Sequence, residues 1–459
     1  SFARSNTTDA VAVNTNANTL TITGATVDAV DVTSAGDLVV DASSNDGAFV
    51  VTSGGDADIT AATATSVSVT STNEAVLTDV DAATEVTLST TGTSAANSAT
   101  SIVTAAAMTT LNVSGNGAAN YVTVASNQAA LTTLNISGDQ DVEVVLAGTD
   151  HDDLASRLTV TDTSTGTSTV NFSAVSTGNL NTTLIGADQI QLSADFEAET
   201  ITYASGQTFL ISEEQDNGTT GTTFTAALGS AATNELNLVI DNDVATDNAT
   251  AATITLTDLT VTNTATVNLS SSVDNIEILD TLVLGTANLV VSGAGTFANT
   301  TGDTITATSI DASANVGAVT FFTDGGVATI KSGDAGDTIT VEGASTAGVT
   351  IHTNGGDDTI DIITAETYTI DGGDGVDTIT MAAGADLTSD AFTVTNVEVV
   401  DIDDTGANNT FAVNSSDVTG DTYTIIASAG NGGVLDIFDV TVNGTTVDLS
   451  GITVETAAI

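Results

Sequence analysis

The chain contains a nine-residue unit, present three times in register, that requires a tight turn followed at once by a strand. The most regular copy, Gly372 to Thr380, reads G-G-D-G-V-D-T-I-T. Two less regular copies precede it, S-G-D-A-G-D-T-I-T at Ser332 to Thr340 and T-N-G-G-D-D-T-I-D at Thr353 to Asp361. The glycines allow the positive φ and close backbone approach that a six-residue turn needs, and the isoleucine begins a buried strand. Such units predict a parallel β-roll, in which the turns stack along one edge.

Each copy places an aspartate at its sixth position, at Asp337, Asp358 and Asp377, which are 21 and 19 residues apart. Two nine-residue half turns make one coil of about 18 residues, so the acidic turns are expected to stack on a single edge. Carboxylate and carbonyl oxygens are the ligands that Ca²⁺ prefers, so the sequence predicts calcium binding there, with plain Gly/Asp turns as the alternative. The expected ligands are the side chains of Asp334, Asp337, Asp357, Asp358, Asp374 and Asp377, helped by the carbonyl groups of Gly333, Gly355 and Gly373.

The net charge of the chain is far outside the range of an ordinary soluble domain. Its 459 residues include 59 acidic side chains and three Lys plus Arg, which gives a formal net charge of -56. Nucleic acid is excluded as a partner, because Arg4, Arg157 and Lys331 are too few and too scattered to neutralise a phosphate backbone. This charge density strains a compact body by self-repulsion, so we expect divalent cations or high salt in its surroundings. An extracellular location is therefore favoured over the cytosol.

Hydrophobic residues make up 41% of the chain and alternate with Thr and Asp at period two, which is the pattern of strands and not of a disordered acidic tail. The chain has no cysteine, so repetition or bound metal must replace disulfides as a source of stability. The absence of proline fits a body made of interior strands, where each backbone N–H is needed as a donor. No run of 18 apolar residues occurs, which predicts no membrane insertion.

Internal repeats extend the expected solenoid beyond the roll. M-T-T-L-N-V-S-G at Met108 to Gly115 recurs as L-T-T-L-N-I-S-G at Leu131 to Gly138, 23 residues later. A period near 20 with one or two short strands per unit is typical of a solenoid, in which the stacking of neighbouring coils makes the core. A second recurrence, N-I-E-I-L-D at Asn275 to Asp280 and N-V-E-V-V-D at Asn396 to Asp401, links the two halves of the chain.

The expected fold class is therefore all-β: a parallel β-solenoid and β-roll with calcium-binding nonapeptide turns, plus irregular β segments. Thr149 to Leu158 is the one convincing helix candidate, with acidic residues at its start and Arg157 near its end, and we expect it to join two bodies. The predicted segments are an N-terminal β-solenoid (1–148), a short helical joint (149–158), an irregular β-solenoid or β-sandwich-like segment (159–302), the calcium-binding β-roll (303–390) and a C-terminal β segment (391–459).

Residues for a catalytic site are scarce. Two histidines and no cysteine leave almost no material for a catalytic triad or a zinc site, so no enzyme activity is expected. His151 is expected to belong to a solvated helix cap together with Asp152 and Asp153, and His352 to lie on a strand without a functional role. Weaker metal candidates are Asp241, Asp243 and Asp247, where a plain acidic loop is favoured, and the half-motif residues Asp303 and Asp421.

Residues Ser332 to Thr380 resemble the calcium repeats of the repeats-in-toxin superfamily. The Ala/Thr/Asp-rich composition, with almost no Lys and no Cys, resembles that of its bacterial surface-layer (S-layer) members. The motif match covers about a tenth of the chain. The resemblance implies a calcium β-roll, secretion by the type I route, and an uncleaved C-terminal secretion signal in the acidic tail Val447 to Ile459.

The expected function is that of a secreted structural protein of the bacterial cell surface, which self-assembles through Ca²⁺ into a two-dimensional S-layer lattice. Like-charged subunits cannot pack edge to edge until divalent ions neutralise their carboxylates. The alternatives are a secreted extracellular filament or adhesin built on the same solenoid, and an enzyme that carries a calcium β-roll. The expected partners are other copies of the chain, with a cell-surface polysaccharide or lipopolysaccharide as a further candidate.

Overall fold

The computed structural model describes residues 11–15, 19–21, 29–42, 47–90, 99–116, 120–125, 129–147, 151–173, 179–192, 200–212, 222–227, 231–241, 253–272, 274–299, 302–323, 326–342, 348–363, 367–381, 392–402, 410–414, 424–427, 437–441, 450 and 453–456. These residues form 42 β-strands and a single helix, α1 (His151–Arg157). Strands of successive coils pair in parallel and in register. The predicted all-β parallel β-solenoid is therefore confirmed. The predicted secretion signal, residues 447–459, lies largely outside the described residues.

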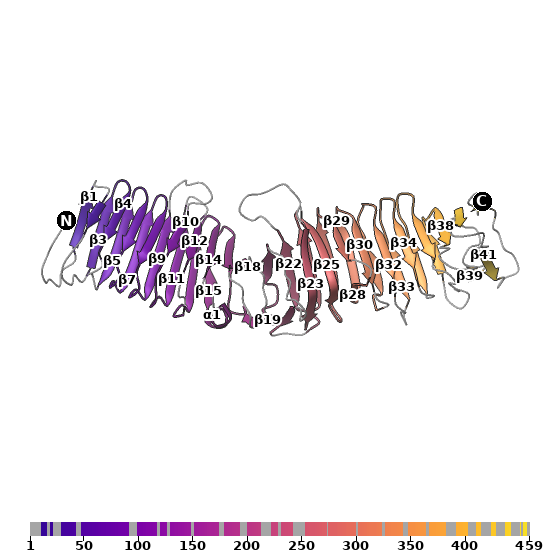
Figure 1. Ribbon diagram of the computed structural model, residues 1–459, viewed down its shortest axis with the longest axis horizontal. Helices are drawn as coiled ribbons and strands as arrows, with labels where there is room; N and C mark the ends of the chain where they lie inside the picture. The colour runs from indigo at the N-terminus through magenta and orange to yellow at the C-terminus, as the bar shows by residue number, and fades with distance from the viewer. Residues whose placement is uncertain are drawn as a thin grey trace. The chain divides into compact units, whose positions relative to one another are not determined.

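The described residues divide into two compact units, one up to residue 212 and the other from residue 222 onward. In the first unit, the coils contribute strands to two long sheets (Figure 1). One sheet consists of β1 (Val11–Thr15), β3 (Ala29–Ser34), β5 (Ala48–Ser53), β7 (Ser66–Ser71), β9 (Glu85–Thr90), β11 (Thr110–Gly115), β13 (Thr133–Gly138) and β15 (Thr159–Asp162). The other consists of β2 (Thr19–Thr21), β4 (Leu38–Asp41), β6 (Ala57–Thr60), β8 (Ala75–Asp79), β10 (Ala99–Ile102), β12 (Asn120–Val124), β14 (Val142–Leu146), β16 (Ser168–Phe172), β18 (Gln189–Leu192) and β20 (Thr208–Ile211). A short additional pair is formed by β17 (Leu180–Asn181) and β19 (Thr200–Tyr203).

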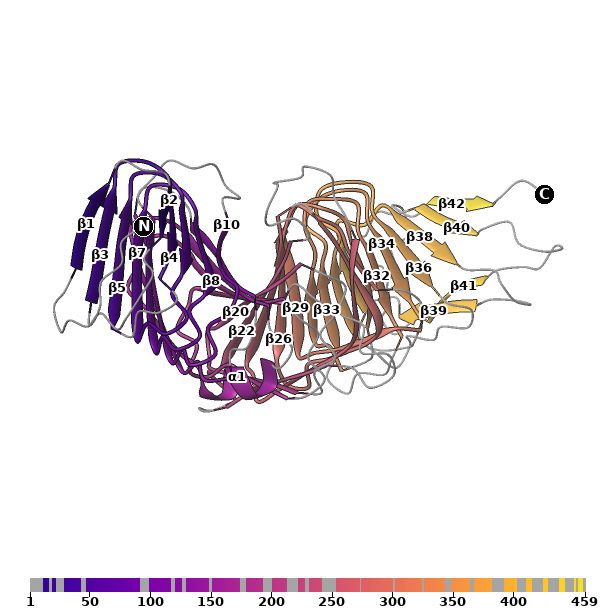
Figure 2. The same cartoon turned by 60° about the vertical axis from the view of Figure 1, so that its left-hand side comes forward.

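The second unit also contains two long sheets, whose strands follow one another along the unit (Figure 2). The first comprises β22 (Glu235–Ile240), β24 (Thr266–Ser271), β26 (Asn288–Gly293), β29 (Ser309–Asn315), β31 (Thr329–Lys331), β33 (Val349–His352), β35 (Tyr368–Asp371) and β37 (Phe392–Thr395). The second comprises β21 (Thr223–Ala226), β23 (Thr253–Thr262), β25 (Asn275–Val283), β27 (Phe297–Asn299), β28 (Thr304–Thr306), β30 (Val319–Thr323), β32 (Thr338–Val341), β34 (Thr359–Ile362), β36 (Thr378–Met381), β38 (Val399–Ile402), β40 (Thr424–Ala427) and β42 (Thr453–Thr456). β39 (Thr410–Asn414) and β41 (Ile437–Thr441) form a separate pair.

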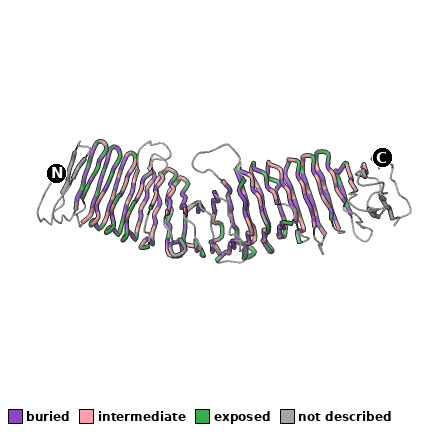
Figure 3. Tube along the Cα trace, in the orientation of Figure 1, coloured by how far each residue is buried: buried purple, intermediate pink, exposed green. Residues whose placement is uncertain are grey.

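The core is made by side chains that alternate inward and outward along each strand. In β7, Val67, Val69 and Ser71 are buried and the residues between them are only partly covered. Figure 3 shows the same change between buried and partly covered residues along the strands of both units. Because neighbouring coils pair in register, the inward side chains stack into apolar columns. One column of the first unit contains Val32, Val51, Val69, Leu88, Val113 and Ile136, none of them more than 2% exposed.

The 23-residue repeat of the first unit corresponds to two adjacent coils. Its copies form β11 and β13, which pair from Thr110 with Thr133 to Gly115 with Gly138. On the outward face of this pair, the Asn135 side-chain amide donates a hydrogen bond of 2.7 Å to Oδ1 of Asn112. The repeat therefore places apolar side chains on apolar ones inside the coil and amides on amides outside it.

The predicted helix is present as α1, a little shorter than the expected range Thr149 to Leu158. It lies within the first unit, where Leu154 and Ala155 are fully buried and the Arg157 Nε donates a hydrogen bond of 3.2 Å to the carbonyl oxygen of Leu131. No helix among the described residues is long and apolar enough to cross a bilayer.

The strand pairs described between residues 159 and 302 are parallel as well. The pairing of β23 with β25 shifts in register between Thr257 and Leu259. Asp258 and Asp280 have positive φ angles of 49° and 61°, a left-handed conformation that Asp tolerates better than most residues. A bulge of this kind accommodates coils of unequal length in a continuous parallel stack.

Truncation of an inward side chain should destabilise the first unit strongly. Leu134 is fully buried between in-register neighbours, so we expect Leu134→Ala to lower the free energy of unfolding by about 2–5 kcal/mol. Thr133→Ala, on the outward face of the same strand, should change it by no more than about 0.5 kcal/mol. Urea unfolding of both variants measures the difference, and equal effects would contradict the inward and outward assignment.

Candidate metal site

The three turns of the predicted motif stack on one edge of the second unit. They connect β31 to β32, β33 to β34 and β35 to β36, and the strands on both sides of the turns pair in register. Asp337, Asp358 and Asp377 stand immediately before β32, β34 and β36, so one sixth-position aspartate follows another from coil to coil. All three are at most 2% exposed. The structure therefore brings these three predicted residues together in a buried column.

Backbone hydrogen bonds connect the carboxylates of this column to one another. The backbone N–H of Asp337 donates to Oδ1 of Asp358 over 2.7 Å, and that of Asp358 donates to Oδ1 of Asp377 over 3.0 Å. The backbone N–H of Asp377 donates in turn to Oε2 of Glu398 over 2.9 Å. We call these four residues the carboxylate ladder. Each turn thus donates to the carboxylate of the turn that follows it in the sequence.

Glu398 is a member of the ladder that the sequence pattern did not predict. The pairing of β36 with β38 places E-V-V-D (398–401) in register with D-T-I-T (377–380), so Glu398 takes the sixth position of a fourth turn. Asn396 has a φ of 51° and thus a left-handed conformation similar to that of Gly373, whose φ is 90°. The signal was the N-V-E-V-V-D recurrence, but its other copy lies within β25, so the two copies have different structures.

The carboxylates of the ladder differ in how many hydrogen bonds they receive. Oδ1 of Asp337 accepts the backbone N–H of Val319 at 2.8 Å, and its Oδ2 accepts that of Gly333 at 3.1 Å. In contrast, Oδ2 of Asp358 and Oδ2 of Asp377 are buried and have no hydrogen-bond partner. A buried charged oxygen without a partner is costly, so these two atoms require either a proton or a cation.

Burial raises the pKa of all three aspartates of the ladder. The pKa of Asp358 rises to about 7, first because the carboxylate is removed from water and further because the carboxylates of Asp337 and Asp377 lie next to it. Burial likewise raises the pKa of Asp337 and of Asp377, and Glu398 adds to the effect on Asp377. Hydrogen bonds from backbone N–H groups offset part of the cost of this stack of like charges at a buried edge.

The other predicted ligands lie around the ladder. Asp334, Asp357 and Asp374 are exposed on the outside of the turns, where Oδ1 of Asp357 accepts the backbone N–H of Val376 at 2.9 Å. Gly355 forms a parallel bridge with Asp374. Gly333 supplies the hydrogen bond to Asp337 described above. At Gly373 only glycine fits, because a Cβ there would lie 1.8 Å from the carbonyl oxygen of Asn354.

The arrangement of these groups fits an oxygen-ligated cation. Among the described residues, no three His, Cys, Asp or Glu side chains converge as a metal-binding group. An ion at the ladder would therefore use carboxylates from consecutive turns and complete its shell with backbone carbonyls or water, as Ca²⁺ does with its six to eight oxygen ligands. The partnerless oxygens of Asp358 and Asp377 are the observation that favours such an ion.

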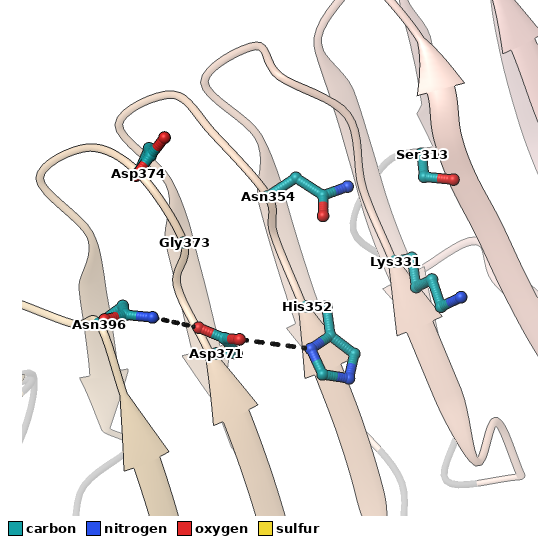
Figure 4. Close-up of a pocket in the computed structure, with 8 residues that line it drawn as sticks. All are labelled: Ser313, Lys331, His352, Asn354, Asp371, Gly373, Asp374 and Asn396. Carbon is teal, nitrogen blue, oxygen red and sulfur yellow. Dashed lines mark hydrogen bonds and ion pairs between the residues drawn. The ribbon is translucent and has the colours of Figure 1, made fainter.

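A polar groove of about 640 Å³ lies beside the acidic edge and includes side chains from β31, β33 and β35 (Figure 4). Two of its side chains lie near carboxylates: Nζ of Lys331 is 3.5 Å from Oδ2 of Asp311, and Nδ1 of His352 is 3.8 Å from Oδ2 of Asp371. Asn396 donates a hydrogen bond of 2.7 Å to Oδ1 of Asp371. Because the lining contains no Phe, Tyr or Trp, the groove offers hydrogen bonds but none of the large aromatic faces on which sugar rings commonly stack.

The weaker candidates of the sequence have separate positions. Asp303 is buried and its Oδ1 accepts the backbone N–H of Asp280 at 2.9 Å, a bond of the same kind as those in the ladder. Asp241 lies directly after β22. Asp243, Asp247 and Asp421 lie outside the described residues, as do the side chains of His151, Asp152 and Asp153.

Comparison with protein families, with curated proteins and with solved structures found no match to this chain.

The free energy of unfolding should depend on pH because the buried carboxyl group of Asp358 has a raised pKa. Its pKa of about 7 in the folded state exceeds the value of about 3.9 in the unfolded chain, so the stability it contributes is complete below about pH 4 and is lost as the pH rises through 7. Without divalent cations, the free energy of unfolding should therefore fall between about pH 4 and pH 7. Asp358→Asn should weaken this fall, because the amide keeps an acceptor for Asp337 but carries no charge.

Urea unfolding in EDTA over this pH range measures the effect. Asp374→Asn removes an exposed carboxylate from the same edge and should leave the fall nearly unchanged, which separates burial from net charge. Identical pH profiles for the wild type and Asp358→Asn would show that Asp358 does not titrate in this range.

Proposed function

We propose that the chain is a secreted structural protein of the bacterial surface, whose roll binds Ca²⁺ and which self-assembles through Ca²⁺ into a two-dimensional surface layer. The observation that supports calcium binding most directly is the pair of buried, partnerless oxygens on Asp358 and Asp377. Neither Lys331 nor His352 supplies the missing positive charge, because their ion pairs are with Asp311 and Asp371. A cation from solution supplies it instead.

The charge of the whole chain supports assembly through divalent ions. A net charge of -56 makes two copies repel each other at any contact between their acidic surfaces. Divalent cations remove this repulsion and bridge carboxylates of neighbouring copies. Parallel coils stacked in register suit a filament as well as a lattice, so the extracellular filament or adhesin remains the alternative.

An enzyme that carries a calcium roll is the third proposal, and the polar groove is the place to test it. There, His352 and Asp371 form the kind of pair that activates a nucleophile, but the pair is 3.8 Å apart. The groove also bears on the proposed polysaccharide partner, since its lining combines hydrogen-bond donors such as Lys331 with acceptors such as Asp371. A structural role is favoured because the most unusual chemistry of the second unit, the carboxylate ladder, lies inside the wall of the solenoid.

Calcium should stabilise the second unit in a saturable way. Extracellular calcium modules have Kd values of about 10⁻⁴ to 10⁻³ M, so a tenfold excess over Kd stabilises by about 1.4 kcal/mol per site. Thermal unfolding with increasing CaCl₂ should show a rising midpoint, and Mg²⁺ should have a smaller effect because it demands a tighter octahedral shell. Asp377→Asn should reduce the calcium effect much more than Asp374→Asn, and a midpoint insensitive to calcium would refute the calcium site.

Assembly is tested separately from calcium binding by the purified chain. Electron microscopy after addition of Ca²⁺ should show ordered sheets, and a chelator should return them to single molecules. Fibres in place of sheets would support the filament alternative. A chain that binds Ca²⁺ and stays monomeric at every concentration would contradict the assembly proposal while leaving the calcium site intact.

A further inference from the structure

The hydrogen bonds of the carboxylate ladder make its two ends unequal. At the N-terminal end, both carboxylate oxygens of Asp337 accept backbone N–H groups, from Val319 and Gly333. One coil and two coils further on, Asp358 and Asp377 each use Oδ1 for a backbone N–H and keep Oδ2 buried without a partner. A buried oxygen that a cation could satisfy is therefore absent at the first aspartate and present at the next two.

We propose that the cation sites of the roll lie at Asp358 and Asp377, that Glu398 supplies a carboxylate to the last of them, and that Asp337 ends the ladder through hydrogen bonds alone. This inference rests on the proposed calcium function. The predicted set of sixth-position ligands was Asp337, Asp358 and Asp377. The proposed set is Asp358, Asp377 and Glu398, which is displaced by one coil toward the C-terminus. Glu398 belongs to this set although its turn reads N-V-E and lacks the glycine-aspartate motif.

The position of Glu398 follows from pairing and from the turn before it. β38 continues the sheet of β36 in full register, so the residue that precedes β38 lies one coil beyond Asp377. Asn396, in the left-handed conformation, lies in this turn. Its side-chain amide donates a hydrogen bond to Asp371, which holds the turn against the preceding coil. Oε2 of Glu398 already accepts the backbone N–H of Asp377, which places this carboxylate against the turn that carries Asp377.

Glu398 also gives an ion a route into the wall of the solenoid. The three aspartates of the ladder are buried, whereas Glu398 is exposed. A flexible carboxylate at the water-facing end can take up an ion and share it with Oδ2 of Asp377, which burial has left without water. Two carboxylates and the carbonyl groups of the adjoining turns then supply oxygen ligands of the kind that Ca²⁺ selects.

Asp337 differs from the other two aspartates because each of its oxygens accepts a backbone N–H. Two backbone N–H groups point at its two oxygens, which stabilises the ionised form in the way that backbone donors stabilise other buried carboxylates. Its neighbour on the C-terminal side, Asp358, has one such donor for two oxygens. The same residue type at the same motif position therefore has a different role at the end of the stack.

The number and affinity of bound Ca²⁺ ions in purified variants of the full chain test the proposal, with calcium titrated by calorimetry. Glu398→Gln keeps an acceptor for the backbone N–H of Asp377 and should lose one site or bind Ca²⁺ there about tenfold or more weakly. Asp337→Asn should retain the number of sites of the wild type, with affinities within about twofold. Asp401→Asn, which removes a carboxylate from β38 outside the ladder, is the matched control and should behave as the wild type.

The outcomes separate this proposal from the one it rests on. A wild-type chain that binds no Ca²⁺ at millimolar concentration refutes the calcium function itself. Binding by the wild type with unchanged binding by Glu398→Gln refutes the role of Glu398, and loss of a site in Asp337→Asn refutes the hydrogen-bonded end. Circular dichroism establishes that each variant is folded. If Glu398→Gln does not fold, Glu398→Asp gives the same readout, because the shorter side chain withdraws the carboxylate and keeps its charge.

Discussion

Parallel stacking in register is the constraint on which the whole structure depends. Each side chain lies beside the equivalent side chain of the next coil, at the strand spacing of about 4.8 Å. Valine on valine and leucine on leucine exclude water, and asparagine on asparagine makes a hydrogen bond, as between Asn112 and Asn135. Aspartate on aspartate is the one combination that is intrinsically unfavourable. The same geometry that builds the core therefore creates the site.

The ladder shows how far the backbone alone can compensate such a stack. At Asp358 and Asp377, one backbone N–H donates to Oδ1 and the buried Oδ2 has no hydrogen-bond partner. Only at Asp337 do backbone N–H groups donate to both carboxylate oxygens. The remaining charge lies where water does not reach. Glycines in the turns serve this arrangement, since the close approach of Gly373 to Asn354 leaves no room for side chains that would separate the coils.

The sequence predicted the parts of the structure that repeat. Alternation at period two gave the strands, the spacing of Leu111 and Leu134 gave the coil length, and the spacing of the sixth-position aspartates gave their common edge. It could not show that Glu398 continues the column, because N-V-E becomes equivalent to a glycine-aspartate turn only through pairing of β38 with β36. Nor could it separate Asp337 from Asp358, since their difference lies in which backbone N–H groups reach each oxygen, and Val319 is 18 residues away in sequence.

All hydrogen bonds of the carboxylate ladder run from a backbone N–H to a carboxylate later in the sequence, and this affects the order in which they can form during synthesis. Each acidic turn donates its N–H to an acceptor that lies further along the chain, 21 residues ahead for Asp337 and 19 ahead for Asp358. During synthesis from the N-terminus, each of these hydrogen bonds can therefore form only after the following coil, which carries the acceptor carboxylate, has been made. The last of these hydrogen bonds, from Asp377 to Glu398, forms only after Glu398 has been synthesised. A chain truncated before Glu398 would therefore leave the backbone N–H of Asp377 without this acceptor.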